Sequence, residues 1–373
     1  MSQKIDISII SSGASLADAR LHRLTRALLR AGLSIEIFAP GEIKDAPSPD
    51  SKLFIRKPFF KAHWKASSLG PRYFRSRYFV FRSKGRVIYA ISPEAIAPSF
   101  AIAKLIRRKL AVDFFEDYLR LLNDRAWTKS YFGIVGWIAK SDTKSALWFA
   151  RRADLTTVAD VQVPPFDARN RLVVRNLPDA SLLTLSGERS STPKAIYIGD
   201  LRKSRGLHDM LRVAELATDW DFDFVGGVAS SDQELVDQWL RSHDPNQTRV
   251  RFHGRLAPQE SWKFAAGAWV GLSLLESTPA FIEAVPSKLY EYMAVGLATI
   301  STPLPRCVEL ISASNSGAIE STPEGVAERL KSWQVNSEEL DRLRSQGAKW
   351  ASENLDSERE YAIFAAEMAK LTR

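Results

Sequence analysis

Apolar and polar residues alternate along the chain in a series of short strands and amphipathic helices. Residues 6–11 form an apolar run of strand length, and residues 16–33 follow with leucines at helical spacing. Gly32 ends that helix, and residues 34–40 supply the next strand. This strand–helix–strand unit is typical of a parallel sheet. Further strands are predicted at 86–92, 109–115, 153–159 and 171–176.

A second series of the same kind follows residues 178–194, which have little periodicity and are rich in Ser, Thr and Pro. We interpret that segment as a linker. Beyond it, strands are predicted at 195–199, 221–227, 249–254, 269–275, 297–302 and 317–321, and the chain from Ser337 onward is predicted to be helical. We therefore expect an α/β protein with two doubly wound, Rossmann-like domains facing across a cleft. Their limits are 1–180 and 181–348, and a C-terminal helix in 349–373 packs back on the first domain.

Length, cysteine content and apolar runs set further limits. The chain has 373 residues, enough for two domains that each bury a core. The single cysteine, Cys307, excludes an intrachain disulfide and fits a reducing compartment. No signal-peptide pattern opens the chain, and no apolar run reaches the roughly 20 residues that a membrane span needs. These features predict a cytoplasmic protein.

Charge is distributed unevenly between the two halves. Residues 1–180 hold 31 Lys and Arg against 16 Asp and Glu, whereas the rest of the chain holds 21 against 27. Basic and aromatic residues interleave at 71–86, and 104–110 add further cations. Such mixing suits an anionic membrane surface or single-stranded nucleic acid. We expect peripheral attachment to the inner face of the cell membrane, with a merely solvated basic face as the alternative.

Two glutamates, Glu283 and Glu291, lie eight positions apart around the start of a predicted helix. Pro286 suits the first turn of that helix, and Lys288 lies one turn before Glu291. A helix N-terminus attracts anions, so the phosphates of a nucleoside diphosphate would meet the amides near Lys288 and its ammonium group. Glu291 would then accept hydrogen bonds from ribose hydroxyls. The alternative is an ordinary surface ion pair between Lys288 and Glu291.

A basic turn at residues 199–206 points to the same ligand. The turn follows a predicted strand and opens an amphipathic helix, with Gly199 and Gly206 at its ends. A guanidinium group can bind two phosphate oxygens at once, and a glycine lets a ligand approach the backbone. Its cations are Arg202, Lys203 and Arg205. A solvated basic turn is the alternative.

Together these features resemble the C-terminal domain of retaining GT-B glycosyltransferases of the family-4 type, in the bacterial polysaccharide branch. That family carries a Glu-x7-Glu motif, matched by Glu283 and Glu291, and a glycine–basic–glycine loop, matched by residues 199–206. The resemblance covers nearly the whole chain and is strongest at 195–305.

The resemblance implies catalytic roles for Glu283 near the donor sugar and for Arg205 and Lys288 at the diphosphate. The full donor-binding set is Gly13, Gly199, Arg202, Lys203, Arg205, Gly206, Arg255, Leu256, Ser287, Lys288, Leu289 and Glu291. Asp200 departs from the family pattern, because a basic residue usually stands there. Phe115 stands near the position where relatives often place a histidine, which leaves Glu116 and Asp117 as acceptor-site candidates.

The implied reaction is transfer of a hexose, with retention, from a UDP-sugar, or next a GDP-sugar, to a glycan or lipid-diphosphate-linked acceptor in surface polysaccharide biosynthesis. The leaving phosphate takes the acceptor's proton, so neither a metal nor another cofactor is expected. The alternatives are a GT-B-fold sugar-nucleotide epimerase and a basic nucleic-acid-binding protein. No nucleic-acid-reading motif is present, so we expect no nucleic-acid partner.

One motif competes with the metal-free mechanism. Asp219, Asp221 and Asp223 form overlapping Asp-x-Asp pairs, and in a different glycosyltransferase fold such a pair holds a divalent metal on the diphosphate. Here the aspartates alternate with aromatic residues, which predicts one solvated edge of a buried strand.

Overall fold

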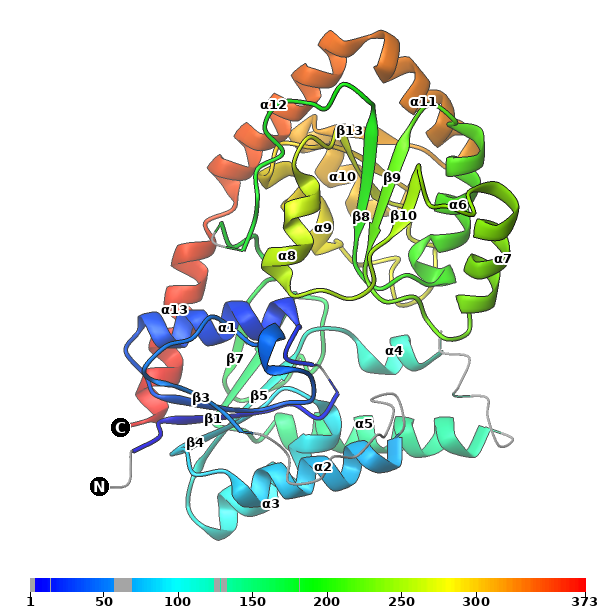
Figure 1. Ribbon diagram of the computed structural model, residues 1–373. Coiled ribbons are helices and arrows are strands. Elements are labelled where there is room, and N and C mark those ends of the chain that lie inside the picture. The colour runs from blue at the N-terminus through cyan, green and yellow to red at the C-terminus, as the bar shows by residue number, and fades with distance from the viewer. Residues whose placement is uncertain (1–3, 14, 57–68, 124–127, 129–132, 181) are drawn as a thin grey trace. The chain divides into compact units, whose positions relative to one another are not determined.

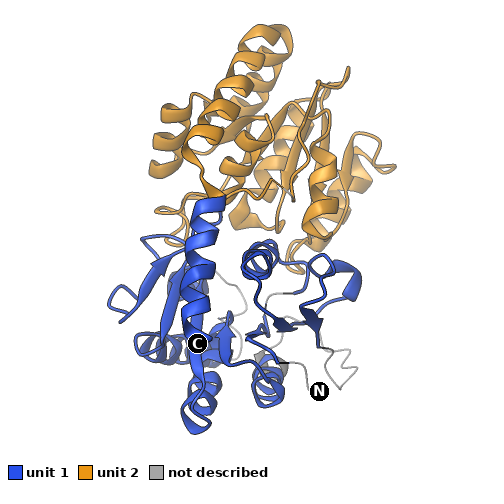
Figure 2. Cartoon of the chain, turned by 90° about the vertical axis from the view of Figure 1, so that its left-hand side faces the viewer, with its two compact units in different colours: residues 1–176, 358–373 blue, residues 177–357 orange. Residues whose placement is uncertain are grey.

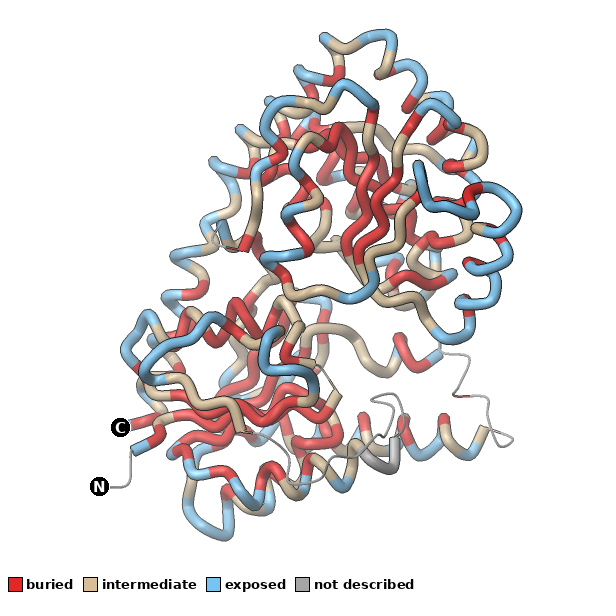
Figure 3. The backbone as a smooth tube through the Cα atoms, viewed as in Figure 1, coloured by how far each residue is buried: buried red, intermediate tan, exposed pale blue. Residues whose placement is uncertain are grey.

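The computed structural model describes residues 4–13, 15–56, 69–123, 128, 133–180 and 182–373, and it divides into two compact units (Figure 1, Figure 2). Unit 1 comprises residues 1–176 and 358–373, and unit 2 comprises residues 177–357. Each unit contains one parallel sheet with buried strands and with helices on both faces (Figure 3). This is the doubly wound architecture that the sequence predicts.

The sheet of unit 1 has seven strands in the order β3-β2-β1-β4-β5-β6-β7, and all neighbouring strands run parallel. The strands are β1 (Ile7–Ile10), β2 (Ile35–Phe38), β3 (Leu53–Ile55), β4 (Val87–Ala90), β5 (Lys109–Phe114), β6 (Leu155–Val158) and β7 (Arg171–Val173). Six of these fall within predicted strands. The sequence did not predict the three-residue edge strand β3.

Helices cover both faces of this sheet because alternate strand residues point to opposite sides. Ile7 and Ile9 pack with helices α1 and α13, whereas Ile10 packs with helices α2, α3 and α5 (Figure 1). Asp18 caps α1 by accepting a hydrogen bond from the Leu21 amide. The helices of unit 1 are α1 (Ala19–Arg30), α2 (Leu69–Arg82), α3 (Pro93–Leu105), α4 (Tyr118–Asn123), α5 (Ile134–Ala150) and α13 (Ser357–Leu371).

Unit 2 repeats the pattern with a six-stranded parallel sheet in the order β10-β9-β8-β11-β12-β13. The strands are β8 (Lys194–Ile198), β9 (Asp221–Val225), β10 (Val250–Phe252), β11 (Val270–Ser273), β12 (Ala298–Ser301) and β13 (Gly317–Ile319). The helices are α6 (Leu207–Leu216), α7 (Gln233–His243), α8 (Pro258–Trp262), α9 (Ser287–Ala294), α10 (Pro305–Ser314), α11 (Pro323–Val335) and α12 (Ser337–Asn354). All six strands were predicted. The strand order reverses between β8 and β11, which is where such sheets bind ligands at their carboxyl ends.

The unit boundaries differ from the predicted limits of 180 and 348. The segment predicted as a linker belongs to unit 2, because its backbone is bonded there: the Ser186 amide donates to the Val295 carbonyl at 2.8 Å. Residues 349–354 complete α12, which Asn336 caps at its start. The C-terminal helix α13 therefore begins at Ser357, and its Phe364 ring packs 5.9 Å from the Tyr89 ring in the core of unit 1.

A buried polar network joins α1 to the sheet of unit 1. Arg20 Nε and Nη2 donate to the two carboxylate oxygens of Asp113 at 2.7 and 2.6 Å. Thr157 Oγ1 donates to the same carboxylate at 2.6 Å, and Arg20 Nη1 donates to the carbonyl of Val174 and to Oδ1 of Asn176. Burial alone would lower the pKa of Arg20, but the charge and the hydrogen bonds of Asp113, with smaller contributions from Tyr89 and Tyr361, together outweigh it and raise that pKa. The Arg20 guanidinium therefore stays charged inside the unit, where four hydrogen bonds hold it. Among the described residues, no helix is long and apolar enough to cross a membrane.

We predict that Asp113→Ala lowers the free energy of unfolding by about 3–5 kcal/mol, because it leaves the Arg20 guanidinium buried without its counter-charge. Urea titration measures this loss. Arg151→Ala is the matched control: it breaks an exposed pair with Asp167, and we expect a change of at most about 1 kcal/mol. Equal losses in the two variants would show that the buried network contributes no special stability.

Candidate active site

The basic turn, residues 199–206, lies at the carboxyl end of β8, beside the end of β11. Gly206 adopts a left-handed conformation with φ of 82° and begins α6. A side chain at this position would place its Cβ 2.0 Å from the Leu274 carbonyl oxygen. Only glycine fits such an approach. The position therefore fixes the turn against β11 at the point where the strand order reverses.

The cations of the basic turn have different surroundings. Arg202 is buried, and its Nε donates to Ser204 Oγ at 3.1 Å. Lys203 is exposed, whereas Arg205 is half-buried with its guanidinium 5.7 Å from the centre of the Phe281 ring. Arg202 and Arg205 are thus held by the protein, and Lys203 is in contact with solvent.

Asp200, the residue that departs from the family pattern, is surrounded by arginines. Its carboxylate pairs with the Arg255 guanidinium, and Tyr197 Oη donates to its backbone carbonyl at 3.0 Å. Burial would raise the pKa of Asp200, but the charges of Arg255, Arg205 and Arg202 outweigh it and lower that pKa. A carboxylate therefore stays ionised at the place where the diphosphate was expected.

The loop that leads from β11 to α9, residues 274–286, runs beside the basic turn. The Glu276 amide donates to the Ser204 carbonyl at 3.2 Å. Phe281, in the same loop, provides the ring near Arg205. The basic turn is therefore in direct contact with the loop that leads to α9, at the strand-order reversal.

Helix α9 begins where the sequence predicts. Pro286 occupies the N-cap position with an extended backbone, and no side chain caps the helix there. Ser287 and Lys288 form its first turn, and Leu289 points into the core. The amide end of α9 thus opens on the loop that contacts the basic turn.

Lys288 and Glu291 form an ion pair, with Nζ and Oε2 separated by 2.9 Å. The side chain of Glu291 is only 2% exposed and that of Lys288 is 20% exposed. The alternative of an ordinary surface pair is therefore wrong, because the carboxylate is buried inside the unit. A buried carboxylate is costly unless it is paired, and Lys288 supplies the pairing.

Glu283 contrasts with Glu291. It is exposed in the loop before α9, and the backbone there is fixed by Arg306, whose Nη1 donates to the Glu283 carbonyl at 2.9 Å. Arg255 and Leu256 follow β10; the Arg255 side chain reaches Asp200, and Leu256 packs on a hydrophobic cluster beside α8. Contact of these residues with a donor remains a prediction.

The remaining site candidates belong to unit 1. The Gly13 amide donates to Ser92 Oγ at 3.2 Å, which ties the first loop to the start of α3. Asp117 caps α4, because its Oδ1 accepts from the amides of Leu119 and Arg120 at 3.1 Å each. This structural task occupies Asp117, and Glu116 lies just before it, half-buried.

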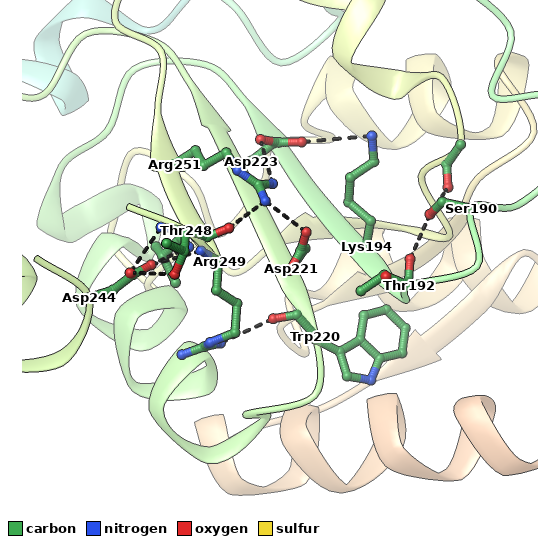
Figure 4. Close-up of polar contacts among 12 residues, drawn as sticks. Ser190, Thr192, Lys194, Trp220, Asp221, Asp223, Asp244, Thr248, Arg249 and Arg251 are labelled. Carbon is green, nitrogen blue, oxygen red and sulfur yellow. Dashed lines mark hydrogen bonds and ion pairs between the residues drawn. The ribbon is translucent and has the colours of Figure 1, made fainter. Parts of the chain in front are cut away.

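The Asp-x-Asp residues do not form one solvated edge. Asp219 is exposed as predicted, but Asp223 is buried, and its carboxylate accepts from His253 Nε2 at 2.7 Å. The same carboxylate lies 3.7 Å from Lys194 Nζ (Figure 4). Asp221 pairs with Arg251 at 2.9 Å. The prediction failed for Asp223 because β10 and the start of β8 bring basic residues over that edge. Within the described ranges, no group of three or more His, Cys, Asp or Glu side chains is placed to hold a metal ion.

The sequence missed one side chain and one ion pair that shape the site. Phe281 packs near Arg205, and the side chain of Arg255, a predicted donor-site residue, pairs with Asp200. Neither contact leaves a local signal, since the partners come from separate loops that only the folded sheet brings together.

Comparison with known proteins agrees with this architecture. Residues 186–350 match the model of the family described as glycosyl transferases group 1. No curated protein sequence matches the chain.

Similar solved structures cover nearly the whole chain. Sucrose-phosphate synthase from Thermosynechococcus elongatus is 12% identical, covers 99% of both chains and gives a TM-score of 0.73. HepE of Anabaena in complex with UDP and glucose is 16% identical, covers 98% of this chain and 100% of its own, and gives a TM-score of 0.66. WaaG, a glycosyltransferase involved in lipopolysaccharide biosynthesis, is 11% identical, covers 98% of this chain and 99% of its own, and gives a TM-score of 0.64.

At these identities the structural likeness shows the fold, and the family model adds the activity class. The match to this family model favours glycosyl transfer over the two alternatives, epimerisation and nucleic-acid binding. The chain is therefore a glycosyltransferase of the GT-B fold, and its residues 186–350 match the group 1 glycosyl transferases.

Proposed function

We propose that unit 2 binds a nucleoside diphosphate sugar between the basic turn and the amide end of α9, and that the enzyme transfers the sugar with retention. The observation that carries this proposal is the contact of the basic turn with the loop that leads to α9, at the reversal of strand order in the sheet. The proposed acceptor is a glycan or a lipid-diphosphate-linked glycan of surface polysaccharide biosynthesis. HepE, which has the same fold, was solved with UDP and with UDP-glucose. This supports UDP as the first donor to test, with GDP next.

The proposed roles follow from charge and burial. Arg205 and the amides of Ser287 and Lys288 stabilise the negative charge that grows on the departing diphosphate. The buried carboxylate of Glu291, oriented by Lys288, accepts hydrogen bonds from ribose hydroxyls. Glu283, exposed at the loop, contacts the sugar.

We infer that these fixed cations and amides replace a divalent metal. The leaving phosphate then takes the proton from the acceptor hydroxyl, so no protein base is required in this scheme. Turnover is expected to persist in EDTA. A strict requirement for Mn²⁺ would contradict the scheme.

We also propose that unit 1 attaches to an anionic membrane surface. Phe74 and Phe81 on α2 are exposed, and so is Trp137 on α5. Exposed arginines lie beside the phenylalanines on α2, at Arg77 and Arg82. Exposed aromatic rings with basic neighbours suit the headgroup region of a bilayer. Vesicle flotation tests the attachment, and equal binding to charged and uncharged vesicles would contradict it.

The donor site is tested by Glu291→Gln, after a thermal-shift screen with UDP, GDP, ADP and dTDP identifies the nucleotide. We predict at least about tenfold weaker binding of that nucleotide, since a hydrogen bond to a charged acceptor contributes about 1.5–3 kcal/mol. Isothermal titration calorimetry measures the affinity. Glu283→Gln is expected to bind the nucleotide normally and to lose turnover.

Glu260→Gln is the matched control for Glu291→Gln. Glu260 forms an exposed ion pair with Lys263, three residues away, which is the spacing of Lys288 and Glu291. Removing its carboxylate should leave nucleotide binding unchanged. If Glu291→Gln and Glu283→Gln both bind and turn over like the native enzyme, the assignment of the two glutamates is wrong.

Asp200 gives the donor site a second testable property. Because its carboxylate neutralises part of the charge of three arginines, it opposes the entry of other anions. Free UDP carries one more negative charge than a UDP-sugar, so Asp200 weakens product binding more than donor binding. The residue therefore favours release of the product.

We predict that Asp200→Asn tightens UDP binding by about five- to tenfold and binding of the UDP-sugar by less. Product inhibition of turnover should rise in parallel, and calorimetry with both ligands checks the difference. Asp221→Asn, which breaks the pair with Arg251 on the same sheet, should change neither affinity. Equal effects of Asp200→Asn on the two ligands would exclude a role in product release.

A further inference from the structure

An open hollow of about 250 Å³ lies in unit 1, where α3 ends and β5 begins. It lies at the amino end of β5, whereas ligands of doubly wound sheets bind at the carboxyl ends. Its charged lining consists of five cations and one carboxylate: Lys104, Arg107, Arg108, Lys109, Arg152 and Asp154. None of these residues belongs to the proposed donor or acceptor sites.

Arg108 is the least exposed of the five cations that line the hollow. Its Nη1 donates to the Ser83 carbonyl and hydroxyl at 3.0 and 3.2 Å. Its Nε and Nη2 are buried and have no hydrogen-bond partner among the residues that the structure describes. Burial lowers the pKa of Arg108, and the charge of Glu36 opposes that shift. These two N–H groups are closed to solvent, so an anion in the hollow would be attracted by the positive charge of Arg108 rather than bonded to these donors.

The carboxylate that lines the hollow already has donors within the protein. Asp154 is already engaged: Lys109 Nζ donates to it at 3.0 Å, and so does the Leu110 amide at 2.9 Å. The Arg152 guanidinium lies 3.7 Å from the centre of the Trp148 ring, which fixes it at the rim. The hollow therefore keeps an excess of positive charge.

The C-terminal dipole of α3 explains only part of this charge. A helix C-terminus attracts cations, but its effect amounts to about half a charge and fades within one turn. Arg152 follows α5 instead and donates from Nη1 to the Trp148 carbonyl in the last turn of that helix at 2.8 Å. Moreover, Arg107 adopts a left-handed conformation with φ of 55° just after α3, a place where glycine is preferred. An arginine there has a conformational cost, which favours a role for its charge.

Two apolar side chains identify the kind of anion. Leu105 and Ile106, at the end of α3 beside the hollow, are 77% and 50% exposed. A soluble phosphate compound would gain nothing from them, whereas a bilayer would bury both beneath its headgroups. We propose that the hollow binds the phosphate headgroup of an anionic membrane lipid, while Leu105 and Ile106 enter the hydrocarbon. This deepens the proposed membrane attachment and gives it a defined binding site.

The test compares the full-length enzyme with Lys104→Gln/Arg107→Gly in flotation with phosphatidylcholine vesicles, with and without phosphatidylglycerol. The glycine relieves the left-handed strain, so the melting temperature should not fall. Binding to the charged vesicles should weaken by about fivefold for each cation removed. Lys263→Gln/Lys349→Gln removes two exposed cations of unit 2 and should stay within about twofold of the native affinity.

A second variant, Leu105→Ser/Ile106→Ser, and a phosphate titration separate lipid from soluble anion. The variant should lose vesicle binding and keep any response of the melting temperature to inorganic phosphate. Unchanged vesicle binding in this variant, with a phosphate response that only Lys104→Gln/Arg107→Gly abolishes, would assign the hollow to a soluble phosphate compound and overturn the proposal.

The failure of each proposal is distinguishable. A native enzyme that ignores phosphatidylglycerol overturns membrane attachment altogether. Native binding that Lys104→Gln/Arg107→Gly leaves intact overturns the hollow alone. UDP binding reports on the donor site independently of either result.

Discussion

The approach of Gly206 to the Leu274 carbonyl is the contact on which the candidate site depends. A Cβ atom has no room there, so the turn can lie against β11 only with glycine. That contact sets the start of α6, places Arg205 near Phe281, and brings the Glu276 amide to the Ser204 carbonyl. Backbone geometry therefore positions the basic turn and the loop that leads to α9, and the charged side chains extend from this fixed backbone.

Those charges are balanced within the protein. Lys288 is paired with buried Glu291, and Asp200 is paired with Arg255 beside two further arginines. A site built only of cations would bind a diphosphate tightly and release it slowly. Internal carboxylates lower that affinity while they keep the cations in place. The proposed donor contacts thus combine ordered positive charge with limited product retention, which suits an enzyme that must turn over.

The sequence predicted the fold well because the signals are local. Buried parallel strands leave apolar runs, and helices leave a 3.6-residue period, so twelve of the thirteen strands were found. The positions of the basic turn and the start of α9 were also predictable from Gly206 and Pro286. What could not be predicted depends on distant partners. Glu291 is buried because the unit closes around it, and Asp223 is buried because basic residues of β8 and β10 cover it.

The return of the chain to unit 1 affects how the protein is made. Residues 177–357 form unit 2 without interruption, so that unit can fold as soon as it leaves the ribosome. Unit 1 cannot complete its core at that stage, because Phe364 and Met368 of α13 belong to it. One apolar face of its sheet therefore stays incompletely covered until the C-terminal helix has been synthesised. The half of the protein that begins first is therefore the half that finishes last.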